Sequence, residues 1–254
     1  MSRLEKRLLR QVGRAVKEFD LLERGDRIMV ALSGGKDSFA LMVLLQHMVR
    51  RAPFPIELIG VNLDQGFTRE TQEGIAAWCA ARGIAHHMVQ ANHTRILAEK
   101  LRPGATPCPL CARLRRGALY DIATELGANK LALGHHRDDM AETLLLNLFY
   151  SGQLKAMAVR LPSDQGNGTV IRPMLYCHEA DLAAYAEEQG FPQLPGPTCG
   201  YGDHRYRARI KALLRDLNED NPKVTSNIMA AMANIRPSHL LDPQFLELSG
   251  PAED

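Results

Sequence analysis

Short apolar runs alternate with helical patterns along the first 190 residues, and this alternation limits the folds open to the chain. Each run is four to eight residues long, which is typical of a strand buried on both faces of a sheet. Strands separated by helices favour an α/β fold with a doubly wound parallel sheet. We predict five strands in the spatial order 3-2-1-4-5. They span residues 27–32, 56–63, 86–89, 130–133 and 170–173.

The helical patterns suggest how the chain is divided. At 254 residues its length suits one large hydrophobic core. Apolar residues at helical spacing predict an amphipathic N-terminal helix within residues 1–24. Residues 25–190 then form the main domain, with a cysteine segment at 100–111. A second cysteine segment and a helical C-terminal segment, together residues 191–254, are expected to pack on the same domain.

Composition and charge exclude several classes of protein. Hydrophobic residues make up 45% and charged residues 24% of the chain, a balance that argues against disorder. The net charge of +2 does not by itself require a nucleic-acid partner. The N-terminus has no apolar signal core, and the apolar stretch at 39–49 is too short to span a bilayer. We therefore expect a cytoplasmic protein without a membrane partner.

The segment Ser33-Gly-Gly-Lys-Asp-Ser38 follows the first predicted strand and precedes a predicted helix. Its two glycines allow a sharp turn and a close approach of the backbone to a ligand. The N–H groups at the start of the helix then point toward a bound anion. A tight strand-to-helix turn without a ligand is the alternative. We predict phosphate contacts for Ser33, Gly34, Gly35, Lys36, Asp37 and Ser38.

A second polar segment, Gly134 to Asp139, follows the fourth predicted strand. Strands one and four are neighbours in the predicted order, so the two segments should meet at the carboxyl edge of the sheet. Mg²⁺ prefers one or two carboxylates plus phosphate oxygens, a role that suits Asp138, whereas Asp139 fits a capping box. A strand-end aspartate is also a common turn former, and a histidine can be purely structural. We predict nucleotide contacts for Asp64, Gly134, His135 and Asp138.

Three of the five cysteines lie in irregular segments rich in proline and glycine. Cys108 and Cys111 form a C-x-x-C pair before a predicted helix, and Cys199 lies in the late segment. Three such thiolates can hold a four-iron four-sulfur cluster and leave one iron without a protein ligand. Structural zinc with His204 as fourth ligand, or a redox dithiol, are alternatives that the spacing does not separate. Core positions are predicted for the remaining cysteines, Cys79 and Cys177.

The segment at residues 33–38, the predicted phosphate loop, resembles the signature of the PP-loop ATP pyrophosphatases. Enzymes of that superfamily hold the β- and γ-phosphates of ATP and leave the α-phosphate open to attack. The resemblance therefore implies that a substrate oxygen is adenylated and that pyrophosphate departs. An adenylated oxygen is a good leaving group, so the same carbon can then accept another nucleophile.

Seven blocks, in order, resemble one family of this superfamily, the tRNA 2-thiocytidine synthetases. The resemblance covers nearly the whole chain, from about Arg27 to about His239. Many relatives carry a second C-x-x-C in the late segment, where this chain has Gly196 at the first cysteine position. The blocks are 29–38 (MVALSGGKDS), 61–65 (VNLDQ), 108–117 (CPLCARLRRG), 123–127 (ATELG), 133–139 (LGHHRDD), 171–173 (IRP) and 237–240 (PSHL).

This resemblance implies a function and a set of cofactors. Family members use ATP, Mg²⁺ and a four-iron four-sulfur cluster to thiolate a cytidine at tRNA position 32. The cluster ligands fall on Cys108, Cys111 and Cys199. We assign catalytic roles to these three cysteines and to Asp37. The implied partners are tRNA, a cysteine desulfurase as sulfur donor, and a second copy of the chain in a homodimer.

Basic side chains cluster beside the cysteines and indicate electropositive surface. An anticodon-loop base is already unpaired, so a protein can bind it at lower cost than a base inside a helix. Ordinary solvated helix faces are the alternative. A competing function is another PP-loop tRNA-modifying ligase, or a sulfurtransferase with a zinc or redox cysteine site. RNA contact is predicted for Arg113, Arg115, Arg116 and Arg207.

Overall fold

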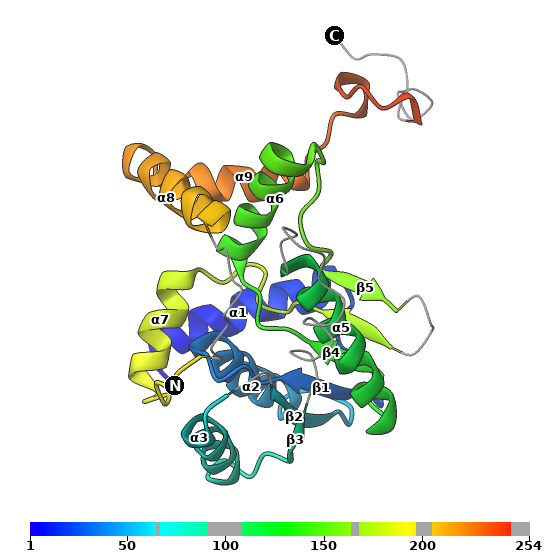
Figure 1. Ribbon diagram of the computed structural model, residues 1–254, viewed down its shortest axis with the longest axis vertical. Helices are drawn as coiled ribbons and strands as arrows, with labels where there is room; N and C mark the ends of the chain where they lie inside the picture. Colours follow the sequence, from blue (N-terminus) through cyan, green and yellow to red (C-terminus); the bar gives the residue numbers. More distant parts are fainter. Residues whose placement is uncertain (65–66, 91–107, 164–167, 197–204, 245–254) are drawn as a thin grey trace, which may run out of the picture.

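A six-stranded sheet forms the centre of the molecule (Figure 1). The computed structural model describes residues 1–64, 67–90, 108–163, 168–196 and 205–244. Neighbouring strands are parallel except for the last pair, which is antiparallel. In sheet order the strands are β3 (His86–Gln90), β2 (Glu57–Asp64), β1 (Arg27–Ala31), β4 (Lys130–Ala132), β6 (Thr169–Ile171) and β5 (Arg160–Pro162).

The predicted doubly wound α/β fold is confirmed. All five predicted parallel strands are present, in the predicted order, with β6 in the place of the fifth. The additional strand, β5, pairs with β6 at the edge of the sheet. All three of its residues are exposed, so it lacks the apolar run from which the other strands were predicted.

Helices cover both faces of the sheet. Along β1, Ile28 and Val30 belong to one hydrophobic core and Met29 to the other, because successive side chains of a strand point to opposite faces. The larger core is covered by α1 (Arg3–Glu18), α2 (Lys36–Val49), α3 (Arg69–Ala80) and α7 (Glu179–Glu188). The opposite face is covered by α5 (Cys108–Glu125).

The N-terminal helix owes its position to an apolar stripe. Ser2 caps α1 by accepting the N–H of Glu5 at 3.0 Å. Leu8, Val12 and Ala15 recur at helical spacing and are fully buried, so one face of the helix packs on the core. In the described part of the chain, every helix is too short or too polar to cross a membrane.

A second group of helices stands over the carboxyl edge of the sheet (Figure 1). Ala141, Ile210 and Leu214 form its small hydrophobic core, which fixes α8 and α9 to α6. The division of the chain at residues 24 and 190 stays a prediction. The three helices are α6 (Arg137–Ser151), α8 (Arg205–Asp220) and α9 (Val224–Met232), and a short 3-10 helix follows at Pro237–His239.

Candidate nucleotide site and cysteine segments

The phosphate loop, residues 33–38, joins β1 to α2 through a left-handed turn. Gly34 has a φ of +77°, which glycine adopts at little cost because it has no Cβ. The Ser38 hydroxyl donates to the carbonyl oxygen of Gly35 at 2.8 Å and accepts the N–H of Ser33 at 3.2 Å. Ser38 thus shapes the loop, while the first N–H groups of α2 have no partner inside their own helix and suit an anion.

The second predicted segment, residues 134–139, packs directly against this loop. A Cβ added to Gly134 would lie 3.2 Å from the carbonyl carbon and oxygen of Asp37 and 3.3 Å from the nitrogen of Ser38. Only a residue without a side chain fits there comfortably. The structure therefore brings the two segments together at the carboxyl ends of β1 and β4, as the strand order predicted.

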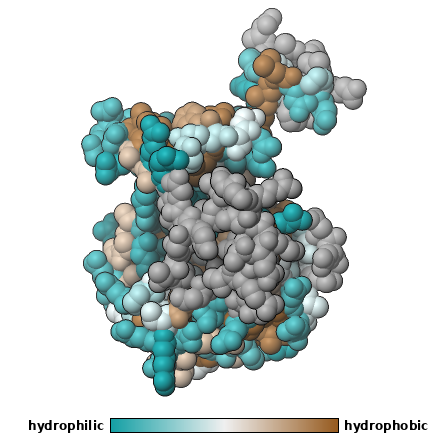
Figure 2. Space-filling view, in the orientation of Figure 1, coloured by the Kyte–Doolittle hydropathy of each residue, from teal (hydrophilic) through white to brown (hydrophobic). Residues whose placement is uncertain are grey.

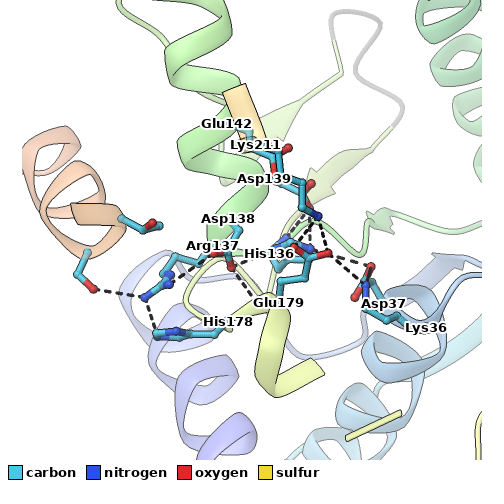
Figure 3. Close-up of polar contacts among 12 residues, drawn as sticks. Lys36, Asp37, His136, Arg137, Asp138, Asp139, Glu142, His178, Glu179 and Lys211 are labelled. Atoms are coloured by element: carbon cyan, nitrogen blue, oxygen red, sulfur yellow. Dashed lines mark hydrogen bonds and ion pairs between the residues drawn. The ribbon is translucent and has the colours of Figure 1, made fainter. Parts of the chain in front are cut away.

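A buried histidine lies among the carboxylates of both segments (Figure 3). His136 Nε2 is 3.4 Å from Asp139 Oδ2 and 4.0 Å from Asp37 Oδ2. Asp139 also accepts the His136 N–H at 3.1 Å, which is the capping role expected of it. Asp37 Oδ1 is buried without a hydrogen-bond partner among the described residues. A buried unpaired carboxylate oxygen is costly, so this atom is suited to bind a cation or a ligand donor.

Asp138 ties the start of α6 to the start of α7. Its Oδ2 accepts the backbone N–H of Glu179 at 2.8 Å, and its Oδ1 accepts from Arg137 at 3.4 Å. Arg137 in turn contacts His178 Nε2 at 2.7 Å and Ser226 Oγ at 3.3 Å. The predicted magnesium ligand is thus already held by protein groups, and its role with the metal stays a prediction.

The electrostatic surroundings of His135 keep this side chain neutral. Arg172, which is buried, donates from Nε to His135 Nδ1 at 3.1 Å. Burial first, and then the charge of Arg172, lower the pKa of His135 to about 4. Because Nδ1 accepts, the neutral ring carries its proton on Nε2, which is a donor for a ligand. The nucleotide contact itself stays a prediction.

At the end of β2, the Asp64 carboxylate binds two residues that follow it in the chain. It accepts the N–H of Phe67 at 3.0 Å and the side chain of Gln72 at 2.9 Å, which agrees with the alternative of a turn former. Its predicted ligand contact is not tested by these bonds. Asn62, which is fully buried, donates to the carbonyl oxygen of Leu32 at 2.9 Å. This bond fixes the end of β2 to the residue that precedes the phosphate loop.

The C-x-x-C pair opens a helix. Helix α5 begins at Cys108, earlier than the predicted start at Cys111. The N-terminal end of a helix favours negative charge. The pair is therefore placed where thiolate ligands of a metal or cluster are favoured. Cys199 and His204 lie outside the described residues, so the ligand set of three stays a prediction.

The late cysteine segment starts beside the phosphate loop. The carbonyl oxygen of Pro195 accepts the Thr71 hydroxyl at 3.1 Å. The methyl group of Thr71 lies 3.6 Å from the position of a Cβ added to Gly34. Pro195 precedes Cys199 by four residues, so the chain leaves the described region next to the predicted nucleotide site.

The other two cysteines are core residues, as predicted. Cys79 and Cys177 are fully buried. Burial raises the pKa of the Cys79 thiol to about 11 and that of the Cys177 thiol to about 12. Thiols with such pKa values are poor nucleophiles and poor metal ligands at neutral pH.

The predicted RNA-binding arginines are exposed, and two of them act on the nucleotide side. Arg113, Arg115 and Arg116 lie on exposed positions of α5. Arg207, on α8, forms an ion pair with Glu142 at 3.5 Å. The charges of Arg115 and Arg207 both contribute to lowering the pKa of His135. Residues from two separate helices therefore direct positive charge toward the same site.

Several polar residues of the site are absent from the sequence-based prediction. Glu179 and Lys211 form an ion pair beside the phosphate loop, and Glu179 also reaches Lys36 (Figure 3). An acidic residue in the first turn of a helix is ordinary, so Glu179 gave no distinct signal. His136 and Arg172 stand inside the motifs at 133–139 and 171–173, and that membership is the signal that could have found them.

Comparison with known proteins gives consistent matches over most of the chain. A family model described as a PP-loop domain matches residues 4–214. The tRNA-cytidine(32) 2-sulfurtransferase of Syntrophotalea carbinolica is 47% identical over 100% of this chain and 98% of its own length. The protein of the same name from Geobacter sulfurreducens is 46% identical over 96% of this chain and 95% of its own length.

Solved structures share the fold. The U34-tRNA thiolase NcsA from Methanococcus maripaludis, solved with its four-iron four-sulfur cluster, has a TM-score of 0.74 at 24% identity. The match covers 91% of this chain and 79% of that one. NMN synthetase from Francisella tularensis has a TM-score of 0.53 at 14% identity, over 85% of this chain and 87% of that one. At these identities the likeness concerns the fold alone.

Proposed function

We propose that this chain, which belongs to the PP-loop family and within it to the tRNA-cytidine(32) 2-sulfurtransferases, catalyses ATP-dependent thiolation of cytidine 32 in tRNA. The family predicted from the sequence motifs is thereby confirmed. The activity is that of the named relatives, which match nearly the full length of the chain. One structural observation supports it most directly: the 134–139 segment and the start of the late cysteine segment meet at the phosphate loop.

In the first half-reaction the cytidine O2 attacks the α-phosphorus of ATP, and pyrophosphate leaves. The phosphate loop and Lys36 hold the β- and γ-phosphates, since a helix start and a cation both favour anions. Asp37 Oδ1, buried and unpaired within the described residues, and Asp138 are the carboxylates we assign to Mg²⁺. Holding the phosphates and the acceptor oxygen in line lowers the barrier by positioning.

In the second half-reaction a sulfur nucleophile adds to C2, and AMP departs with the former O2. Cys108, Cys111 and Cys199 would hold a four-iron four-sulfur cluster, and the position of the C-x-x-C pair at a helix start fits thiolate ligands. When bound, such a cluster with three cysteine ligands offers one iron for the sulfur to be transferred. The buried cysteines take no part because burial raises the pKa of each thiol.

The RNA is held by the exposed arginines. Arg113, Arg115 and Arg116 on α5, and Arg207 on α8, present positive charge to phosphates of the anticodon loop. Arg115 and Arg207 share an electrostatic influence on His135, which supports an RNA path that ends at the nucleotide. From the family resemblance we also propose a cysteine desulfurase as the sulfur donor, a homodimer, and the cytoplasm as the location.

The test is mass spectrometry of nucleosides from tRNA of cells with and without this gene. We expect 2-thiocytidine to disappear without the gene, and to return with the wild-type chain but not with Cys199→Ala. Iron and sulfide analysis of the protein purified without oxygen separates the cluster from zinc. Unchanged 2-thiocytidine in the deleted cells, with no second enzyme of this family present, would contradict the proposed function.

A further inference from the structure

Glu179 lies between two lysines from different helices (Figure 3). The Lys211 Nζ, from α8, donates to both carboxylate oxygens at 2.8 Å. The Lys36 Nζ, from the phosphate loop, lies 3.6 Å from Oε1. The carboxylate therefore makes two charge-assisted hydrogen bonds to Lys211 and a longer ion pair to Lys36. Charge-assisted bonds of this length are the stronger kind.

The position of this carboxylate is fixed by its backbone. Glu179 is the first residue of α7, and its N–H donates to Asp138 Oδ2 at 2.8 Å. Burial would raise the pKa of Glu179, but the hydrogen bond and charge of Lys211, and then the charge of Lys36, lower it on balance. The hydrogen bond to Glu179 raises the pKa of Lys211. Glu179 and Lys211 are thus both charged at neutral pH.

A lone carboxylate in this place would oppose the binding of ATP. The phosphates of ATP carry several negative charges, and Lys36 is the side-chain cation of the loop that we assign to them. Without Lys211, the Glu179 carboxylate would repel those phosphates. Lys36 would then be the one ion-pair partner left to Glu179 among the described residues. With Lys211 bound to both oxygens, Glu179 is neutralised, and Lys36 can move from the weaker contact to the phosphates.

We propose that Glu179 is a positioning residue that holds Lys36 beside the phosphate loop, and that Lys211 is the counter-charge that keeps Glu179 from repelling ATP. This inference rests on ATP being a substrate, as in the proposed function. It gives Lys211 a different task from the basic residues that precede it on α8, Arg205, Arg207 and Arg209, although all four form one basic run in the sequence.

A double-mutant cycle with the full-length, cluster-loaded protein tests this assignment. The probe is α,β-methylene ATP with Mg²⁺, and tRNA binding is measured in parallel. We expect Lys211→Met to weaken binding of the nucleotide about fivefold, the upper range for partly exposed ion pairs. Adding Glu179→Gln should restore the affinity to within about twofold, because the repulsive charge is then gone. Lys211→Arg should bind like the wild type.

The control for net charge is Arg209→Met, which removes an exposed cation from the same helix. We expect this variant to leave nucleotide binding unchanged. Glu179→Gln alone should bind the nucleotide at least as well as the wild type. Its kcat for thiolation should nevertheless fall about threefold. Lys36 would then keep, among the described residues, its hydrogen bond to Asp37 Oδ2 at 3.2 Å but lose the second carboxylate that fixes its direction. A residue with a merely structural role would not separate kcat from nucleotide affinity in this way.

Two outcomes would overturn the inference while leaving the proposed function intact. One is additive loss of nucleotide binding in the double variant, which would mean that Glu179 and Lys211 act separately. The other is weaker tRNA binding by Lys211→Met with normal nucleotide binding, which would make Lys211 an RNA contact. A wild-type protein that binds no nucleotide at all would instead overturn the proposed function, and this inference with it.

Discussion

The nucleotide side and the RNA side of this molecule are built in different ways. At the carboxyl edge of the sheet, Asp37, His136 and Asp139 are packed together, and Gly134 leaves no room for a side chain. On α5, by contrast, Arg113, Arg115 and Arg116 are exposed and form no ion pair with another described residue.

This difference separates two kinds of work. Chemistry on ATP needs groups held in one geometry before the substrate arrives, because positioning and fixed charge supply most of the effect. Binding of an RNA backbone depends on the number of positive charges more than on their exact placement.

Hydrophobic surface also gathers on the helical part formed by α6, α8 and α9 (Figure 2). Its exposed side chains include Leu148, Phe149, Leu213 and Leu217.

The largest expected effect is a loss of thiolation without a loss of nucleotide binding, on removal of one cluster cysteine. Cys111→Ala should lower the rate of thiolation by about 10³-fold or more, the scale of removing a catalytic residue. Binding of α,β-methylene ATP should stay within about twofold, because α5 lies on the other side of the sheet from α2. Cys79→Ala, at a buried cysteine, serves as the control and should keep the activity. Loss of thiolation in both variants would point to a folding defect instead.

A methyl group added where the 134–139 segment contacts the phosphate loop should weaken nucleotide binding and leave tRNA binding intact. Gly134→Ala places a Cβ 3.2 Å from the backbone of Asp37, so the loops must move apart. We expect nucleotide affinity to fall by about tenfold to a hundredfold, while tRNA affinity is preserved. Calorimetric titration with each ligand measures both. Gly117→Ala, where nothing lies within 4 Å of the added Cβ, should change neither, and equal losses in both variants would contradict the comparison.

Neutralising the arginines should produce a graded effect on RNA. Each of Arg115→Ala and Arg207→Ala should weaken tRNA binding severalfold and reduce the slope of log affinity against log salt by about 0.7. The double variant should lose about twice that slope. Nucleotide affinity should fall by less than tRNA affinity in all of them, because their charges reach the nucleotide site only from a distance. An unchanged salt slope would mean that these side chains do not meet phosphate. The control is Arg69→Ala, at an exposed position of α3, which should leave the salt slope unchanged.

The smallest expected effect is a dependence of stability on pH. The pKa of His135 is lowered from 6.5 to about 4 in the folded protein, so the unfolded chain takes up a proton more readily. Its contribution to stability is therefore complete above pH 6.5 and is lost as the pH falls toward 4. His135→Asn can still accept a hydrogen bond from Arg172. In this variant the midpoint of urea unfolding should depend less on pH between pH 6.5 and 4. An identical pH profile in both proteins would show that His135 is not desolvated.

The motifs and the order of the strands could be predicted from the sequence, whereas contacts between helices that are far apart in the chain could not. The loop at 33–38, the segment at 134–139 and their meeting follow from strand order, because parallel strands end at one edge. Asp139 was recognised as a cap from its position at the start of a helix. Glu179 and Lys211 were not predicted, because they meet only when α7 and α8 pack near the phosphate loop.

Two further features lay beyond the sequence patterns for physical reasons. The edge strand β5 has three exposed residues, so its pairing depends on β6 rather than on an apolar run of its own. The role of Asp138 as a link between α6 and α7 depends on the backbone N–H of Glu179. A pattern search sees a carboxylate after a strand and cannot see which donor reaches it.

The antiparallel strand at the edge of the sheet has a consequence for how copies of this chain behave in a crowded cell. An open sheet edge is a template onto which another chain can add a strand, and this is a route to aggregation. Here β6 is covered by β5, a strand of three residues that ends in Pro162. Proline has no N–H to offer and short strands pair weakly. The sheet is thereby protected on this side against growth from one molecule into the next.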